Sequence, residues 1–342
     1  MKNKNREIDI LENPVIGGIK QWILIRGRNS SNPVLLLLQA GPGFPMISES
    51  DSFEKILKLE ERFTVVYWDQ RGCGKSYNNK IPVASMSLQQ MVADTNEVTE
   101  FLKGKLNKKK IYITGFSLGG SVALIAASKY PENYFLVVGV GIDVVMKEAE
   151  EYAYQFAISE AEIRKQKRAM AQLKKIGPPP HTLIKNFQVR VKWITNFGGI
   201  NLNETFFSLL MKTMRNLFSS SFYSAKDILK TLRGINFSQK YLLPNIVSLD
   251  LFETVKSLDT KIYFIQGTKD AAAPPALAKK YFDFLNEPKG KIFISFNNSA
   301  HMPHIEEPEK FRALLVNEIC ELSQKRLAPV FLQSVPSLNL TL

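Results

Sequence analysis

The sequence predicts an α/β fold with a mostly parallel central sheet, helices on both faces of that sheet and an inserted helical cap. Short apolar segments rich in β-branched and aromatic residues alternate with segments of helical apolar spacing along most of the chain. This alternation stops between residues 143 and 245, where only helical patterns remain. The 342 residues, of which 45% are hydrophobic and 23% are charged, suffice for one large α/β domain that carries an insertion.

Seven segments are predicted to be strands, because each is short, apolar and of strand-like composition. They are residues 19–26, 34–39, 63–68, 111–115, 134–140, 261–266 and 291–296. Residues 111–128 contain no charge over 18 positions, which is the length of a membrane span. Gly115, Gly119 and Gly120 instead divide this stretch into a strand, a turn and the start of a helix, so we expect no transmembrane segment there.

Two of the predicted helices have recognisable starts. Asp51 with Glu54, and Ser87 with Gln90, have the spacing of a capping box, in which two side chains bind the free backbone N–H groups of the first turn. Further helices are expected from the apolar spacing over residues 121–130, 281–285 and 311–319.

The all-helical segment is expected to form the cap. It contains a long charged helix from about Glu148 to Ile176, which Gly177 and three prolines end. Open α/β sheets bind their ligands at the carboxyl edge, and we place the cap over that edge. The predicted organisation is a core of residues 1–142 and 246–326, a cap of residues 143–245, and a C-terminal tail of residues 327–342 without an assigned role.

The charge of the chain is strongly basic and unevenly distributed. The formal net charge is +13, and residues 146–245 hold 16 Lys or Arg against 7 Asp or Glu. No zinc-finger spacing, RNP-type aromatic run or dense basic tract accompanies this charge, so we interpret it as solvated helical surface. We expect no nucleic-acid or membrane partner, and a small molecule or short peptide as substrate. The basic cap disfavours a cationic substrate.

The cysteine content indicates a reducing compartment. Cys73 and Cys320 are too few for a disulfide framework and lie far from any metal-binding spacing. The first residues carry charge with no apolar run behind them, so neither a signal peptide nor an anchor is expected there. We therefore expect a cytoplasmic protein.

The strongest chemical signal is the GxSxG sequence Gly115-Phe116-Ser117-Leu118-Gly119, between a predicted strand and a predicted helix. A turn this tight lifts the serine above the sheet, and the small residues on either side of it prevent a collision of backbones. A serine hydroxyl is a poor nucleophile at neutral pH unless a positioned base takes its proton. Ser117 is therefore the candidate nucleophile.

Three histidines are candidates for that base. His181 lies in the predicted cap, whereas His301 and His304 follow the last predicted strand. The order serine, acid, histidine places the base after a late strand, far downstream of the nucleophile. We prefer His301 because it comes sooner after the strand, and interpret His304 as a packing or helix-entry residue.

The acid that orients the base should follow a strand between the serine and the histidine. Asp270 follows the strand at 261–266 and precedes three small alanines, which leave room for an imidazole ring. Asp143 follows the strand at 134–140. We prefer Asp270, with Asp143 as the alternative.

Stabilisation of a developing oxyanion needs backbone N–H donors. One is expected from Leu118, directly after the nucleophile, and the other from Gly41 in the turn Ala40-Gly41-Pro42-Gly43. Gly74-Lys75-Ser76 ends like a phosphate-binding Walker A loop, but that motif needs a glycine where Asp69 stands. We instead expect Asp69 and Arg71 to hold the loop in place.

Four segments extend these assignments to a family resemblance. They are QAGPG at 39–43, DQRGCGKS at 69–76, GFSLGG at 115–120, and GTKD at 267–270 with SAHMPHIEEPEKF at 299–311. Together they resemble the α/β-hydrolases and, within that superfamily, the proline iminopeptidase-like serine hydrolases. Their order and separation match the family from about Ile19 to Ile319.

This resemblance implies Ser117 as nucleophile, Asp270 as acid and His301 as base, with a helical cap after the sixth strand and no metal or organic cofactor. The chain departs from the family in two places. The turn that reads HGGPG in the family has Gln39 and Ala40 here; a Cβ at position 40 costs roughly 1 kcal/mol or more if φ is positive there. The family's aminopeptidases hold the substrate's N-terminal ammonium with cap carboxylates, and those residues have no match in this cap.

The first hypothesis is a serine hydrolase that forms an acyl-enzyme with small esters or with short peptides that begin with proline. A second is a carboxylesterase or lipase-like acyl hydrolase, which uses the same site and differs in the cap pocket. A third is a catalytically silent ligand-binding protein with this fold, which the altered QAGPG turn suggests.

Overall fold

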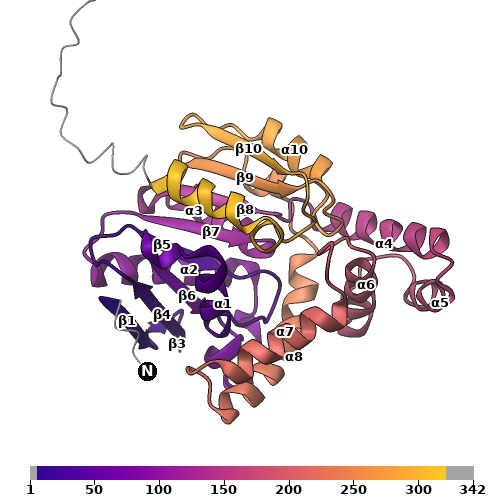
Figure 1. Ribbon diagram of the computed structural model, residues 1–342, viewed down its shortest axis with the longest axis horizontal. Helices are drawn as coiled ribbons and strands as arrows, with labels where there is room; N and C mark the ends of the chain where they lie inside the picture. The colour runs from indigo at the N-terminus through magenta and orange to yellow at the C-terminus, as the bar shows by residue number, and fades with distance from the viewer. Residues whose placement is uncertain (1–5, 321–342) are drawn as a thin grey trace, which may run out of the picture.

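An eight-stranded sheet forms the centre of the protein in the computed structural model, which describes residues 6–320 (Figure 1). The strand order is β1-β4-β6-β5-β7-β8-β9-β10. The six strands from β6 to β10 in this order are parallel, whereas β1 and β4 are antiparallel to their neighbours. The predicted mostly parallel sheet is confirmed. The strands are β1 (Ile8–Glu12), β4 (Trp22–Gly27), β5 (Val34–Leu38), β6 (Thr64–Asp69), β7 (Ile111–Phe116), β8 (Tyr134–Val140), β9 (Lys261–Gly267) and β10 (Lys291–Phe296), with β2 (Val15–Ile16) and β3 (Ile19–Lys20) in a separate hairpin.

Helices cover both faces of the sheet, so the predicted layers are also confirmed. One apolar core joins the sheet to α2, α3 and α10, and a second joins its opposite face to α1 and α12. The helices are α1 (Ser50–Leu57), α2 (Leu88–Lys105), α3 (Leu118–Lys129), α4 (Met146–Ile163), α5 (Lys167–Ile176), α6 (Ile184–Asn196), α7 (Phe206–Ser219), α8 (Ala225–Ile246), α9 (Leu251–Thr254), α10 (Pro275–Phe284), α11 (Pro303–Glu306) and α12 (Pro308–Ala313), with a π-helix at Leu314–Cys320.

Strand β5 shows why the central strands read as continuous apolar runs. Successive side chains of a strand point to opposite faces of its sheet. Val34, Leu36 and Leu38 accordingly enter one core, and Leu35 and Leu37 enter the other. All five are buried, as expected for a parallel sheet with helices on both sides.

Helices α4 to α8 lie between β8 and β9 in the chain and group together beside one end of the sheet (Figure 1). A third apolar cluster, which includes Ala157, Leu173 and Trp193, holds α4, α5 and α6 together. We call α4 to α8 the cap helices. The predicted single helix from Glu148 to Ile176 is wrong: the chain turns between α4 and α5, where Lys165 has a φ of 52° that no helix residue adopts.

Some elements and helix caps differ from those predicted from the sequence. Strand β1 was not predicted, although it extends the sheet by pairing with β4. The predicted helix cap at Asp51 is wrong, because α1 begins at Ser50 and Asp51 already lies inside the helix. The Asp51 carboxylate forms an ion pair with Arg26 instead. Ser87 does cap α2, but the Gln90 side chain donates to Asp94 instead of completing the box. Residues 327–342, the predicted tail, lie outside the described residues.

The loop after β6 is held by two buried side chains, as predicted. The Asp69 carboxylate accepts hydrogen bonds from the backbone N–H groups of Met46, Ile47 and Lys75 and from the hydroxyl of Tyr223, which lies in the segment between α7 and α8. Lys75, the lysine of the apparent phosphate motif, is itself buried and donates to Asp227 on α8. The loop therefore joins the sheet to the cap helices and does not form a phosphate cradle.

Arg71 makes the second of these anchors. Its guanidinium binds both carboxylate oxygens of Asp94 at 2.8 and 2.9 Å and donates to the carbonyl of Gly17, and the two charged side chains are almost completely buried. Removing one partner of a buried ion pair leaves the other charge uncompensated. We expect Asp94→Ala to lower the free energy of unfolding by about 3–5 kcal/mol, measured by urea denaturation. Loss of less than about 1 kcal/mol would contradict this role and give the pair the small value of an exposed one.

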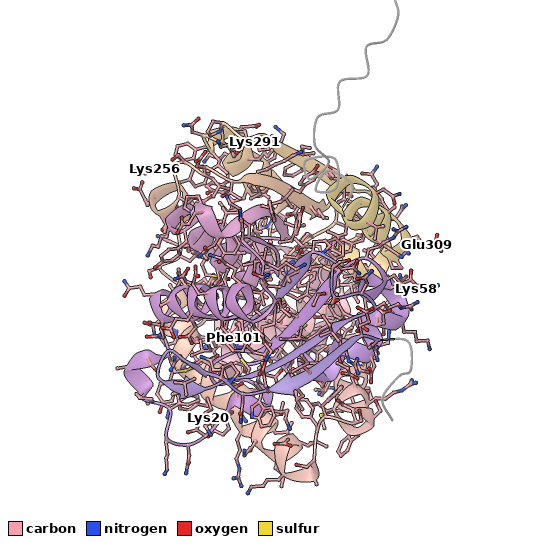
Figure 2. The ribbon with its side chains drawn as sticks, turned by 90° about the vertical axis from the view of Figure 1, so that its left-hand side faces the viewer. Lys20, Lys58, Phe101, Lys256, Lys291 and Glu309 are labelled. Carbon is pink, nitrogen blue, oxygen red and sulfur yellow. The ribbon has the colours of Figure 1, made fainter. Side chains whose placement is uncertain are left out.

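The surface carries the positive charge. Figure 2 shows Lys20, Lys58 and Lys256 pointing away from the core, as expected for solvated lysines. Among residues 6–320, no helix combines the length and the apolar character that crossing a bilayer requires.

Candidate active site

Ser117 lies at the sharp turn between β7 and α3. Its backbone has φ 52° and ψ −125°, a sparsely populated conformation for a residue with a side chain, and its N–H donates to the carbonyl of Val140 at 2.8 Å. A Cβ on Gly115 would lie 2.2 Å from the carbonyl oxygen of Gly119, and one on Gly119 would lie 2.4 Å from that of Gln39. The strained serine thus depends on the two glycines that the motif supplies.

The turn after β5 lies beside this serine. Positive φ angles occur at Gly41 (61°) and Gly43 (94°) and not at Ala40. The alanine that replaces the family's glycine therefore introduces no backbone strain. Gln39 is buried, and its side-chain amide donates to Sγ of Cys73 at 2.9 Å. The Cα of Ile235 on α8 lies only 2.8 Å from where a Cβ on Gly43 would stand, so a cap helix packs directly on the turn.

The dihedral angles give a prediction for this turn. We expect Ala40→Gly to change kcat by less than about twofold, because there is no strain to relieve. Gly41→Ala should lower kcat roughly tenfold, since the left-handed conformation costs a residue with a Cβ about 1–2 kcal/mol. The nearest atoms to that Cβ would be 3.6 Å away, so the cost is conformational and not a clash. Kinetics of both variants with one substrate test this; a tenfold gain in Ala40→Gly would show that the turn is strained after all.

Asp270 and His301 meet at the carboxyl edge of the sheet. Asp270 follows β9, His301 follows β10, and Nδ1 of the histidine lies 2.8 Å from Oδ2 of the aspartate. The other oxygen, Oδ1, accepts from the backbone N–H groups of Ala272 and Ala273, both at 2.8 Å. Gln266 donates to Oδ2 at 2.9 Å. The Asp270 carboxylate is thereby fixed against the ring.

Asp143 brings a second carboxylate to the same place. The Ser117 hydroxyl donates to its Oδ2 at 3.3 Å, and the Ser121 hydroxyl donates to its backbone carbonyl at 2.6 Å. Between Asp143 and the end of β8 lies Gly141, where a Cβ would stand 3.0 Å from Nδ1 of His301. The structure therefore brings Ser117, Asp143, Asp270 and His301 together.

The grouping of two carboxylates with the histidine shifts the pKa values of His301 and Asp143. Burial opposes a charge on His301, but the carboxylates of Asp270 and Asp143 outweigh it and raise the pKa of the imidazole to about 9. Burial raises the pKa of Asp143 to about 6; the charge on His301 acts against this rise and that of Asp270 adds to it. The site thus stabilises a positive charge on the histidine.

The other two histidines are elsewhere. His304 is buried in α11 with its ring 4.3 Å from that of Phe116, and burial, with the nearby His301, lowers its pKa to about 3. It is a neutral packing residue, as predicted. His181 lies in the cap beside Arg190, which pairs with Glu150 at 2.6 Å.

Glu306 has a role that the sequence did not predict. Its carboxylate accepts from the backbone N–H groups of Ala300 and Met302, on either side of His301, and from that of Leu202 in the cap. The backbone N–H of His301 itself donates to the carbonyl of Ile200 at 3.0 Å. One side chain thus fixes the histidine loop against the cap, and only its place five residues after His301 could have suggested it.

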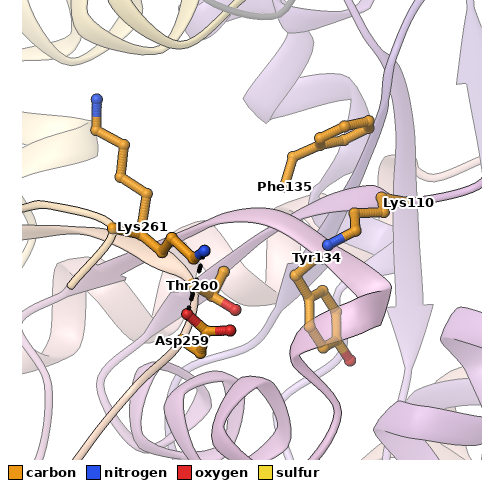
Figure 3. Close-up of a pocket in the computed structure, with 7 residues that line it drawn as sticks. Lys110, Tyr134, Phe135, Asp259, Thr260 and Lys261 are labelled. Carbon is orange, nitrogen blue, oxygen red and sulfur yellow. Dashed lines mark ion pairs between the residues drawn. The ribbon is translucent and has the colours of Figure 1, made fainter. Parts of the chain in front are cut away.

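A depression of about 300 Å³ opens at the opposite end of the strands (Figure 3). It is lined by residues that precede or begin β7, β8 and β9, including Lys110, Tyr134 and Lys261, and by the ion pair of Lys289 with Asp259. It lies at the amino edge of the sheet, away from Ser117, and none of the predicted site residues lines it.

Comparisons with known proteins agree with the α/β fold of the chain. Residues 33–170 match the family model of the alpha/beta hydrolase fold. The chain is 32% identical over 313 residues to the probable aminopeptidase YbaC of Bacillus subtilis, an alignment that covers 90% of this chain and 95% of the relative. It is 24% identical over 288 residues to a proline iminopeptidase of Heyndrickxia coagulans, covering 84% and 90%. A proline iminopeptidase-related protein of Thermus thermophilus has a similar fold, with a TM-score of 0.64 at 16% identity over 92% of this chain and 98% of that one.

Proposed function

Because the chain belongs to the α/β-hydrolase family, we propose that it is a serine hydrolase that removes N-terminal residues from short peptides through an acyl-enzyme on Ser117. The observation that carries the proposal is the pairing of His301 with Asp270 at 2.8 Å beside a serine held at φ 52°. The relatives named as aminopeptidase and proline iminopeptidase support the choice of an amide substrate.

In this mechanism His301 takes the proton of Ser117 as the hydroxyl oxygen attacks the substrate carbonyl carbon. The resting hydroxyl donates to Asp143, so attack begins with its rotation toward Nε2 of His301. Asp270 keeps the proton of the neutral ring on Nδ1 and stabilises the imidazolium that forms. His301 then protonates the leaving amine, and a water molecule, activated by the same histidine, releases the acyl group.

The negative charge on the carbonyl oxygen would be stabilised by backbone N–H groups of Leu118 and Gly41. Leu118 is the first residue of α3, where backbone donors have no partner inside the helix. Gly41 lies in the turn that packs beside α3 through the contact of Gly119 with the Gln39 carbonyl. Donors held in this way need no reorganisation when the charge develops, and each contributes about 10²–10³ to kcat.

Labelling with a fluorophosphonate probe, followed by mass spectrometry of the modified peptide, tests the nucleophile. We expect the label on Ser117, and an unlabelled protein would support the silent ligand-binding hypothesis. Hydrolysis of prolyl arylamides compared with p-nitrophenyl esters of simple acids then tests the substrate class. Turnover confined to the esters would favour the carboxylesterase hypothesis.

A further inference from the structure

We propose that Asp143 is a specificity residue that binds the free α-ammonium group of the substrate. This inference rests on the proposed hydrolase function and names the residue of this chain that would hold the ammonium group of its substrate. It is carried by the contact between the Asp143 carboxylate and the hydroxyl of Ser117.

The mechanism uses only one of the two carboxylates. Asp270 already meets the histidine and has its oxygens satisfied by Gln266, Ala272 and Ala273. Asp143 is 7% exposed, and its carboxylate accepts a hydrogen bond from the Ser117 hydroxyl. That bond must break when Ser117 delivers its proton to His301. A buried carboxylate without a partner is costly, and a cation brought by the substrate would replace the lost donor.

The geometry of an aminoacyl group suits this position. Its nitrogen and carbonyl carbon are separated by one Cα, which places them about 2.5 Å apart from ordinary bond lengths and angles. When the carbonyl carbon lies against the Ser117 oxygen, the ammonium is therefore in the immediate neighbourhood of that oxygen. A carboxylate oxygen 3.3 Å from the same atom is within reach of a charge-assisted hydrogen bond to it.

The local charges favour a cation despite the basic cap. The charges of His301, Asp270 and Arg190 act on the Asp143 carboxylate and shift its pKa. Arg190 is committed to Glu150, at 2.6 Å, and His301 is paired with Asp270. The excess of lysine and arginine between residues 146 and 245 is largely solvated, so it does not decide which charge is accepted next to Ser117. The proposal therefore departs from the expectation from composition that the cap disfavours a cationic substrate.

Two matched esters test the proposal. Benzyl prolinate and benzyl cyclopentanecarboxylate have acyl groups with five-membered rings, but only the prolinate ring contains the ammonium nitrogen. Both esters release benzyl alcohol, which is measured by chromatography. We expect the natural protein to prefer the prolinate in kcat/KM, and Asp143→Asn to reduce this preference by roughly 10- to 100-fold, the worth of a hydrogen bond to a charged group. Asp270→Asn, the same change on the neighbouring carboxylate, should lower both rates and keep their ratio.

Failure of the proposed hydrolase function and failure of the ammonium role of Asp143 give different results in this experiment. If neither ester is hydrolysed and the fluorophosphonate does not label Ser117, the proposed function fails. If both are hydrolysed and Asp143→Asn leaves their ratio unchanged, or lowers both rates equally, the ammonium role is overturned.

A pH series on the natural protein gives a test without a variant. The preference requires ionised Asp143, so it should be present above pH 6 and decline as the pH falls through about 6. Protonation of His301 acts on both substrates and cancels in the ratio. A ratio that stays constant between pH 8 and pH 5 would overturn the proposal.

Discussion

Ser117→Ala and His301→Ala are each expected to reduce kcat by about 10⁶, the loss that follows when either member of a nucleophile and base pair is removed. The two side chains act as one unit, because the hydroxyl attacks only as the imidazole accepts its proton. The double variant should therefore be no slower than either single one. Stopped assays with a chromogenic ester, together with active-site titration by the fluorophosphonate, measure these effects.

His304→Ala is the matched control for the base. His304 lies three residues away but is buried against Phe116 and Phe53, with a pKa of about 3. Its removal should lower the thermal midpoint through the cavity left in the core and leave kcat within about tenfold. An inactive His304→Ala protein beside an active His301→Ala protein would reverse the assignment.

Asp270→Asn is expected to lower kcat by roughly 10⁴ without loss of the fold. An amide that donates toward Nδ1 favours the histidine tautomer with its proton on Nε2, and that tautomer cannot accept the proton of Ser117. The substitution keeps the shape of the side chain, and its amide oxygen can still accept from Ala272 and Ala273, whereas its amide NH2 takes the place of the oxygen that accepts from Gln266. Circular dichroism and kcat on one preparation separate catalysis from folding.

Asp143→Asn should affect the ester without an ammonium group far less than Asp270→Asn does. Asp143 contacts Ser117, whereas Asp270 contacts the ring nitrogen that sets the tautomer. If Asp143→Asn proved the more damaging change at equal stability, the acid would belong to β8 and the assignment of GTKD would be wrong.

Much of the fold could be predicted because local periodicity and burial agree. The run Val34 to Leu38 reads as a buried strand because both of its faces meet a core. Strand β1 was missed because its sequence, IDILE, carries charge and lies at the edge of the sheet, where pairing with β4 decides its conformation. The break between α4 and α5 was missed because charged residues with good helix propensity continue through it.

The site was partly predictable for a related reason. Ser117, Asp270 and His301 each follow a strand, and parallel strands bring their carboxyl ends to one edge. Sequence order indicates that such residues converge, but it does not give the distance between two side chains. The contact of Asp143 with Ser117 and the bonds of Glu306 depend on loop conformations, and no spacing in the sequence encodes them.

The four hydrogen bonds to Asp69 have a consequence for exchanging the cap between proteins. One oxygen fixes the chain just after the turn of Gly41, and the other accepts from Lys75 and from Tyr223, which enters from between α7 and α8. A chimera that receives a foreign segment in place of residues 143–245 loses the Tyr223 hydroxyl and leaves the buried carboxylate short of one donor. Such a graft would alter the rate constant for chemistry along with the choice of substrate. A cap exchanged to change the substrate specificity should therefore supply a hydroxyl at the position of Tyr223.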